Sequence, residues 1–131
     1  MLRRRIRVAV PIALLALAAC DTTTGLDEVT MEGKWDAVGA LGQVAPGLRL
    51  LLQPEVNGTF TGTWYFTDTF PQGTVAGQRS GAETVSFTLF NYPGGNRNFS
   101  GVLTTILRMS GTMDVGQTNG EAVFLRSSFS P

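Results

Sequence analysis

From Gly33 onward, apolar and hydroxyl-bearing residues alternate along the chain. The clearest case is Thr59–Phe66. There, Phe60, Trp64 and Phe66 share one phase of the alternation, and three threonines share the other. A period of two places successive side chains on opposite faces of a strand. The pattern therefore predicts β-strands that each bury one face and expose the other to water.

Turn residues recur between these segments at the spacing of an all-β sandwich or barrel. Asn57-Gly58 is the clearest hairpin turn, because Asn-Gly accepts the positive φ angles of a type I′ turn. We predict eight strands: Lys34–Ala40, Leu48–Gln53, Thr59–Thr67, Thr74–Arg79, Thr84–Asn91, Asn98–Ile106, Leu107–Val115 and Glu121–Ser127. No turn residue separates the sixth strand from the seventh, so one long bent strand is the alternative there.

Eight antiparallel strands can close into an up-and-down barrel, which removes exposed sheet edges. The interior of such a barrel is filled by side chains or holds one small ligand. Gly62, Gly77, Gly101 and Gly111 fall in the apolar phase and are candidate bends of a small barrel. The predicted fold class is therefore all-β, a small antiparallel eight-stranded up-and-down barrel. A β-sandwich with these glycines at bulges is the alternative.

The N-terminal residues follow a different pattern. Four arginines in the segment 1–7 precede Val8–Ala19, which is uncharged and rich in Ala, Leu, Val and Ile. A basic segment followed by a short apolar one is typical of a secretory signal peptide. The apolar run is too short for a transmembrane helix, which needs about 20 residues. We therefore expect residues 1–19 to be a signal peptide.

The sequence Leu17-Ala18-Ala19-Cys20 resembles the lipobox of bacterial lipoproteins. This resemblance covers the signal region only. It implies cleavage before Cys20 and attachment of a diacylglycerol to its thiol, which would anchor the chain to a membrane. Cys20 is the only cysteine, so no intramolecular disulfide is possible. The alternative is an ordinary secretory signal followed by a chance cysteine.

Residues 20–32 are mostly polar, and we expect a flexible tether between the lipid and a domain that spans residues 33–131. The predicted location is the periplasmic side of the cell envelope, at the inner or the outer membrane. Asp21 resembles an inner-membrane retention signal of some enterobacteria. Removal of residues 1–19 leaves six basic and ten acidic side chains. This acidic balance excludes a basic nucleic-acid-binding surface.

Gly33-Lys34-Trp35 opens the first predicted strand, and Arg126 lies near the end of the last. This arrangement resembles the calycin pattern of lipocalins and avidins, in which that tryptophan covers the closed end of the barrel and a basic residue packs on it. Residues 57–64 also resemble the second hairpin of avidins. The resemblance implies a barrel and a contact between Trp35 and Arg126. It does not extend to biotin, because Trp35 and Trp64 are the only tryptophans.

Four residues are candidates for binding a ligand: Trp35, Trp64, Arg79 and Arg126. For the two tryptophans, the alternative is packing in the core. The two arginines fall in the apolar phase, where a head group at a strand end can reach water. An arginine inside the lumen would instead bind an anionic group.

The chain has no histidine, which excludes the commonest general base and the usual zinc sites. With Cys20 lipidated, thiol catalysis is also excluded. Glu55, Asp68, Asp114 and Glu121 fall at predicted strand ends or in loops, where we expect solvated surface. We predict no enzymatic activity, no catalytic or metal-binding residue and no cofactor.

Two functions remain open. One is a structural or protein-interaction role, in which the domain docks on an envelope protein. The other is lipocalin- or avidin-like binding of a small apolar or amphipathic ligand. The barrel interior separates them, because a lumen filled with Phe, Leu and Met favours the first.

Overall fold

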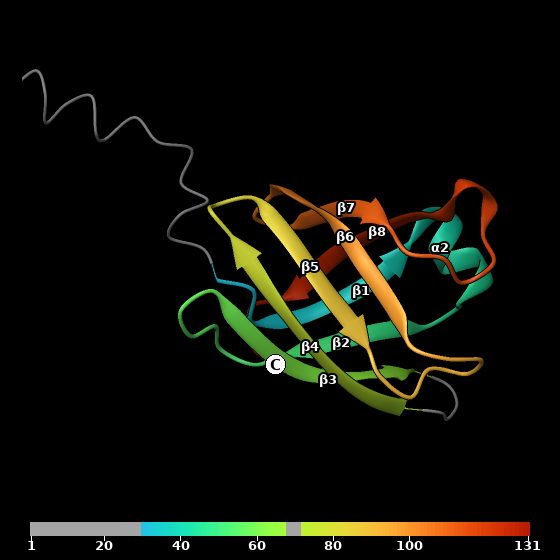
Figure 1. The fold of residues 1–131 in the computed structure, drawn as a ribbon, viewed down its shortest axis with the longest axis horizontal. Helices are drawn as coiled ribbons and strands as arrows, with labels where there is room; N and C mark the ends of the chain where they lie inside the picture. Colours follow the sequence, from blue (N-terminus) through green and yellow to red (C-terminus); the bar gives the residue numbers. More distant parts are fainter. Residues whose placement is uncertain (1–29, 68–71) are drawn as a thin grey trace, which may run out of the picture.

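Figure 1 presents a computed structural model of the chain, in which residues 30–67 and 72–131 are described. Eight strands, each antiparallel to the next, form one closed barrel in sequence order, and the last strand pairs with the first. The up-and-down barrel is thus confirmed, and the sandwich alternative is wrong. The predicted signal peptide, Cys20 and the tether up to residue 29 lie outside the described residues.

The strands differ in length from five to nine residues. They are β1 (Gly33–Val38), β2 (Leu48–Leu52), β3 (Thr59–Phe66), β4 (Gln72–Ser80), β5 (Thr84–Leu89), β6 (Arg97–Thr105), β7 (Arg108–Thr112) and β8 (Glu121–Ser128). A short α-helix, α2 (Gly39–Val44), follows β1, and a 3-10 turn, η3 (Thr118–Gly120), precedes β8.

The strands bury one face and expose the other, as the period-two alternation predicts. Phe60, Trp64, Phe87 and Leu103 are all buried inside the barrel. The intervening threonines of β3 are exposed on the outside. Closing the sheet therefore gathers the apolar phase of every strand into one core.

Four phenylalanines from four strands meet across the lumen. The rings of Phe87 and Phe99 stack with their centroids 4.7 Å apart. The ring of Phe124 packs edge-on against both of them, with centroids 5.8 Å apart. Phe60 packs edge-on against Phe87 at 6.5 Å. Aromatic pairs favour these geometries, which add stability beyond the area they bury.

Glycines lie directly against these rings. A Cβ atom at Gly77 would lie 2.5 Å from the Cβ of Phe87 and 2.7 Å from the Cζ of Phe60. A Cβ at Gly101 would lie 2.8 Å from the Cζ of Phe99. The absence of a side chain at these two glycines therefore provides the space that the aromatic rings occupy.

The first connection departs from the sequence prediction. β1 ends at Val38, whereas the predicted strand continued to Ala40. Gly39 takes a positive φ of 61° and ends the strand, and the helix α2 follows. Leu41 and Ala45 point into the barrel and are buried, so this connection covers one end of the core. The other strand boundaries agree with the prediction or differ from it by at most three residues.

The connection between β6 and β7 resolves the alternative that the sequence left open. The two strands form a hairpin in which Thr105 pairs with Arg108 across the two residues Ile106 and Leu107. The side chain of Thr105 accepts a hydrogen bond from the N–H of Leu107 at 3.1 Å. A single bent strand is therefore excluded.

The barrel has two different ends. We call the end where the described chain begins the entry end, and it comprises residues 30–32, 53–58, 81–83, 106–107 and 129–131. The opposite end, which we call the helix end, comprises α2 and residues 45–47, 90–96 and 113–120. Both ends appear in Figure 1, with α2 at one of them.

We predict that Phe99→Ala lowers the free energy of unfolding by about 3–5 kcal/mol, because it leaves a cavity within the aromatic cluster. The matched control on the same strand is Val102→Ala, whose side chain faces outward, and its effect should stay within about 0.5 kcal/mol. Urea denaturation monitored by tryptophan fluorescence measures both values. Equal losses for the two variants would contradict a filled lumen.

Candidate functional site

Trp35 and Arg126 form the centre of the entry end. They are cross-strand partners on β1 and β8, and the guanidinium carbon lies 4.4 Å from the centroid of the indole ring. The contact that the calycin resemblance implies is therefore present. The Nε1–H of the fully buried Trp35 donates to the carbonyl of Met31 at 3.0 Å. Phe129 lies against the same guanidinium at 4.6 Å, so two aromatic rings contact one cation.

The Arg126 guanidinium also ties together two parts of the chain that are far apart in sequence. Nη1 donates to the carbonyl of Ile106 at 3.1 Å, and Nη2 donates to the carbonyl of Thr30. Burial lowers the pKa of Arg126 to about 10, although the nearby Glu32 carboxylate partly opposes this shift. The Nε atom is buried and has no hydrogen-bond partner among the described residues. Among the described residues, the rings and carbonyls thus hold this charge without a direct ion pair.

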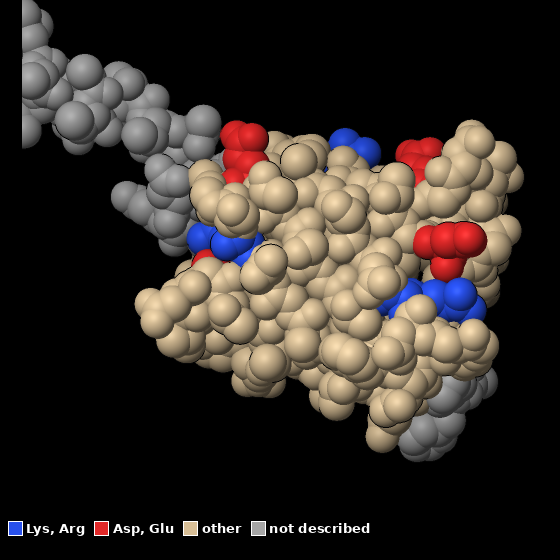
Figure 2. Space-filling model, viewed as in Figure 1, with Lys and Arg blue, Asp and Glu red and all other residues tan. Residues whose placement is uncertain are grey.

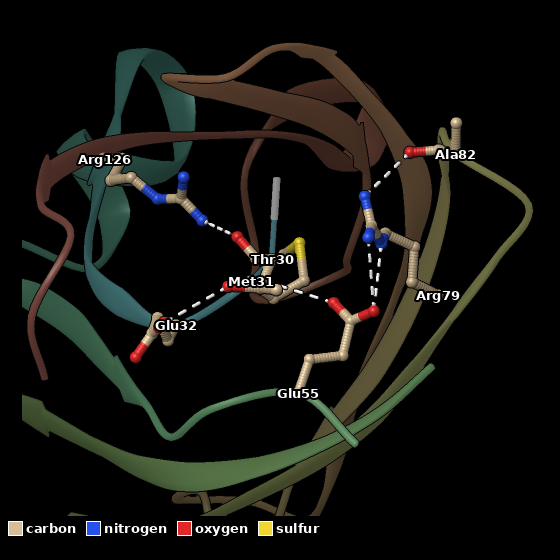
Figure 3. A network of polar contacts seen from close by, with 7 residues as sticks. All are labelled: Thr30, Met31, Glu32, Glu55, Arg79, Ala82 and Arg126. Atoms are coloured by element: carbon tan, nitrogen blue, oxygen red, sulfur yellow. Dashed lines mark hydrogen bonds and ion pairs between the residues drawn. The ribbon is translucent and has the colours of Figure 1, made fainter. Parts of the chain in front are cut away.

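A second buried polar pair, Glu55 and Arg79, lies at the same end (Figure 3). The Oε2 atom of Glu55 is 3.2 Å from Nη2 of Arg79, and the two side chains are only 9% and 7% exposed. Arg79 also donates from Nη1 to the carbonyl of Ala82 at 3.1 Å. The other oxygen of Glu55 accepts the N–H of Met31 at 3.2 Å. This carboxylate therefore holds both an arginine and the chain segment that enters the barrel.

The expectation that Glu55 is solvated surface is wrong. The β2–β3 loop returns over the barrel end through the turn at Asn57-Gly58, which takes φ angles of 52° and 77°. An antiparallel bridge between Val56 and Thr59 fixes this turn. The loop therefore directs Glu55 toward Arg79 instead of toward water.

Trp64 belongs to a separate cluster. It shares a register row with Trp35, with Leu50 between them, but its contacts are at the helix end. Its Nε1–H donates to the carbonyl of Phe90 at 2.7 Å, and its ring lies 5.1 Å from that of Tyr92. Burial raises the pKa of Tyr92, and the nearby Arg97 opposes this shift.

The structure thus brings three of the four candidate ligand residues together and leaves Trp64 outside that group. The polar groups at the entry end face one another, since Glu55 lies against Arg79 and carbonyl oxygens lie against Arg126. Figure 3 shows this network closing the mouth of the barrel. These contacts cover this end of the core.

Charged residues are distributed unevenly over the outside of the barrel. On β1, β2, β7 and β8 the outward positions include Lys34, Asp36, Arg49, Arg108 and Glu121. On β3 to β6 no outward position of a strand is charged. These positions are Thr59, Thr61, Thr63, Tyr65, Gln72, Thr74, Ala76, Gln78, Ser80, Thr84, Ser86, Thr88, Asn98, Ser100, Val102 and Thr104. We call this surface the uncharged wall, and the middle of the view in Figure 2 shows part of it.

A shallow depression lies at the β2 edge of the uncharged wall, on the outside of the barrel. Its volume is about 480 Å³, and its lining includes Leu51, Thr63, Tyr65 and Gln72. Beside it, Arg49 is paired with Asp36. Hydrogen bonding to Asp36, and then to Tyr65, raises the pKa of Arg49. The outer surface is thus hollowed where the uncharged wall meets the charged strands.

Comparisons of the chain with protein-family models, with curated proteins and with solved structures find no match. The fold itself is a closed eight-stranded antiparallel barrel, which is compatible with a calycin-like barrel. Within the described ranges, no three His, Cys, Asp or Glu side chains are grouped to hold a metal ion. Among those same residues, no helix is long and apolar enough to cross a membrane.

We predict that Glu55→Gln destabilises the fold by about 3–5 kcal/mol, because it removes the carboxylate that forms a buried ion pair with Arg79. Adding Arg79→Met to this variant should recover part of the loss, since the buried positive charge is then removed together with its carboxylate. A double-mutant cycle measured by urea denaturation gives the coupling between the two side chains. Purely additive effects would contradict a functional pairing of the two charges.

Proposed function

We propose that this chain is a lipid-anchored lipoprotein of the bacterial cell envelope, and that its barrel has a non-catalytic structural or protein-interaction role. The observation that carries this proposal is the filled interior of the barrel. Phe60, Phe87, Phe99 and Phe124 occupy the middle of the lumen, and all four are buried. A binding barrel needs interior space for its ligand, so a filled lumen supports a role carried out by the outer surface.

Both ends of the barrel support the same conclusion. At the entry end, Met31 and Trp35 are fully buried beneath the Arg126 network. At the helix end, Leu41 is fully buried and Gln117 donates to the carbonyls of Met113 and Glu121. These contacts weigh against the alternative role, the uptake of a small apolar ligand by a lipocalin-like cavity. They leave the outer surface as the place where the domain meets other molecules.

The uncharged wall is the surface best suited to contact another protein. The cores of protein interfaces are depleted in charged residues, whose desolvation is costly. Tyr65 adds an aromatic side chain beside the depression, and tyrosine is enriched in interfaces. Cross-strand pairs of β3 to β6 hold this surface as a continuous sheet. A preformed surface of this kind can dock with little ordering of the backbone.

The lipid anchor is supported by the sequence at residues 1–20. A basic segment, a short apolar segment and Leu17-Ala18-Ala19-Cys20 occur in the order found in lipoprotein precursors. Lipidation of Cys20 also accounts for a single cysteine in an exported chain, because an unmodified thiol would otherwise be exposed to oxidation.

We predict that the full chain expressed in a bacterium is processed to an N-terminal Cys20 that carries a diacylglycerol. Mass spectrometry of the N-terminal peptide measures the modification, and membrane fractionation measures the anchoring. Cys20→Ser should lose the lipid and leave the membrane fraction, whereas Thr22→Ser should retain both. An unmodified Cys20 in the wild-type chain would remove the anchor from the proposal.

We predict that a photo-crosslinking residue placed at Thr88, in the uncharged wall, yields one adduct of defined mass in the cell envelope. The same residue at Ser127, which faces outward on β8, should yield none. Denaturing electrophoresis and mass spectrometry of the purified adduct identify the partner. Absence of a wall-specific adduct, together with a small molecule retained in the native mass spectrum, would favour the ligand-binding alternative instead.

A further inference from the structure

Large apolar side chains are exposed at the entry end. They are Ile106 at 43%, Leu107 at 47%, Phe129 at 53% and Val56 at 66% exposure. At the helix end, Val44 and Phe90 are the exposed large apolar residues among those described. Exposed apolar groups gathered at one place indicate a surface that contacts another apolar phase.

The β6–β7 turn departs from the usual chemistry of a tight hairpin. Two-residue hairpin turns favour Asn, Asp and Gly, as Asn57-Gly58 illustrates in the β2–β3 loop. Ile106 and Leu107 occupy the β6–β7 turn, take no positive φ angle and project about half of their surface into solvent. Neither turn geometry nor core packing requires apolar residues here. A local rule broken without a structural gain points to a functional requirement.

Three of these side chains form one group around Arg126. Its Nη1 holds the carbonyl of Ile106, its backbone N–H donates to the carbonyl of Leu107 at 2.8 Å, and Phe129 packs over its guanidinium. We call Ile106, Leu107 and Phe129 the apolar rim. These contacts of Arg126 therefore fix the position of the apolar rim relative to the barrel.

The described chain begins at this same end. The carbonyl of Thr30 accepts a hydrogen bond from Arg126, and the N–H of Met31 is held by Glu55 (Figure 3). Thr30 lies ten positions after Cys20, and a chain of that length spans at most about 35 Å. A lipid on Cys20 would therefore keep the entry end close to the bilayer surface. The helix end lies on the far side of the barrel.

We infer that the apolar rim inserts into the interfacial region of the membrane that holds the lipid anchor. This inference rests on the proposed lipidation of Cys20. The anchor supplies proximity, and the rim supplies a second contact that orients the barrel, as one chain and a further signal do in other peripheral proteins. Phenylalanine, leucine and isoleucine have the apolar character that this region accepts.

Charged groups at the entry end limit the contact to one side of it. Arg108 follows Leu107 directly and can reach lipid phosphates while the apolar residues insert. Glu32 and Glu83 also belong to this end of the barrel and favour water. The contact therefore centres on the β6–β7 turn and the C-terminal residues, with the acidic groups outside the bilayer.

The test uses the full chain carrying Leu107→Cys, purified from bacterial membranes with its lipid. Lipidation consumes the thiol of Cys20, so an environment-sensitive fluorophore attaches at position 107 alone. The labelled protein is reconstituted into phosphatidylcholine vesicles that contain lipids with a quencher near the headgroup. We expect blue-shifted emission whose intensity is several-fold lower than in vesicles that lack the quencher.

The matched control is Val44→Cys at the helix end, whose native side chain is 45% exposed. A label there should retain water-like emission and little quenching. Circular dichroism of both variants verifies that the fold is retained. Water-like emission at position 107 in a lipidated chain would overturn this inference and leave the proposed anchor intact. A mass without lipid at Cys20 would overturn the proposed anchor, and this inference with it.

Discussion

Closure of an eight-stranded sheet leaves a lumen that side chains can fill, and this constraint determines the rest of the molecule. Phe60, Phe87, Phe99 and Phe124 take up the space, while Gly77 is the smallest possible neighbour to two of those rings. These rings contact one another in the middle of the lumen, and all four are buried. This packing is the reason that the proposed function is assigned to the outer wall and the ends of the barrel.

Closing the two ends requires polar chemistry, because a barrel end exposes carbonyl groups and the edge of the core at once. At the entry end the solution is two buried arginines, each held in a different way. Arg79 is neutralised by Glu55, whereas Arg126 relies on two aromatic rings and two backbone carbonyls. Removing charge from water is costly, and the lowered pKa of Arg126 reflects that cost. In return for this cost, the network joins the entering chain, the β6–β7 turn and the last strand.

The sequence was sufficient for the strands and their faces, because its strongest signal, the period of two, is a property of each strand taken alone. It favoured a barrel but left a β-sandwich open, because closure depends on pairing of the first strand with the last. It also placed Trp35 against Arg126, through the calycin resemblance. It could not predict the pairing of Glu55 with Arg79, because these residues are 24 positions apart and meet only when the β2–β3 loop folds over the barrel end. The helix α2 was missed for a related reason: its six residues are too few to show a helical period, and their position depends on covering the core. Local patterns thus determine the strands, and long-range closure determines the ends.

The position of the apolar rim determines how the uncharged wall would be oriented relative to the membrane. The uncharged wall covers β3 to β6, while the rim lies where β6, β7 and β8 reach the entry end. If the entry end rests on the bilayer, the strands rise from the membrane and the wall faces sideways along it. A partner in the same membrane would then meet a neutral surface at a fixed height and orientation. Because both molecules are confined to two dimensions, even a modest affinity for that surface would be strengthened by their high effective concentration.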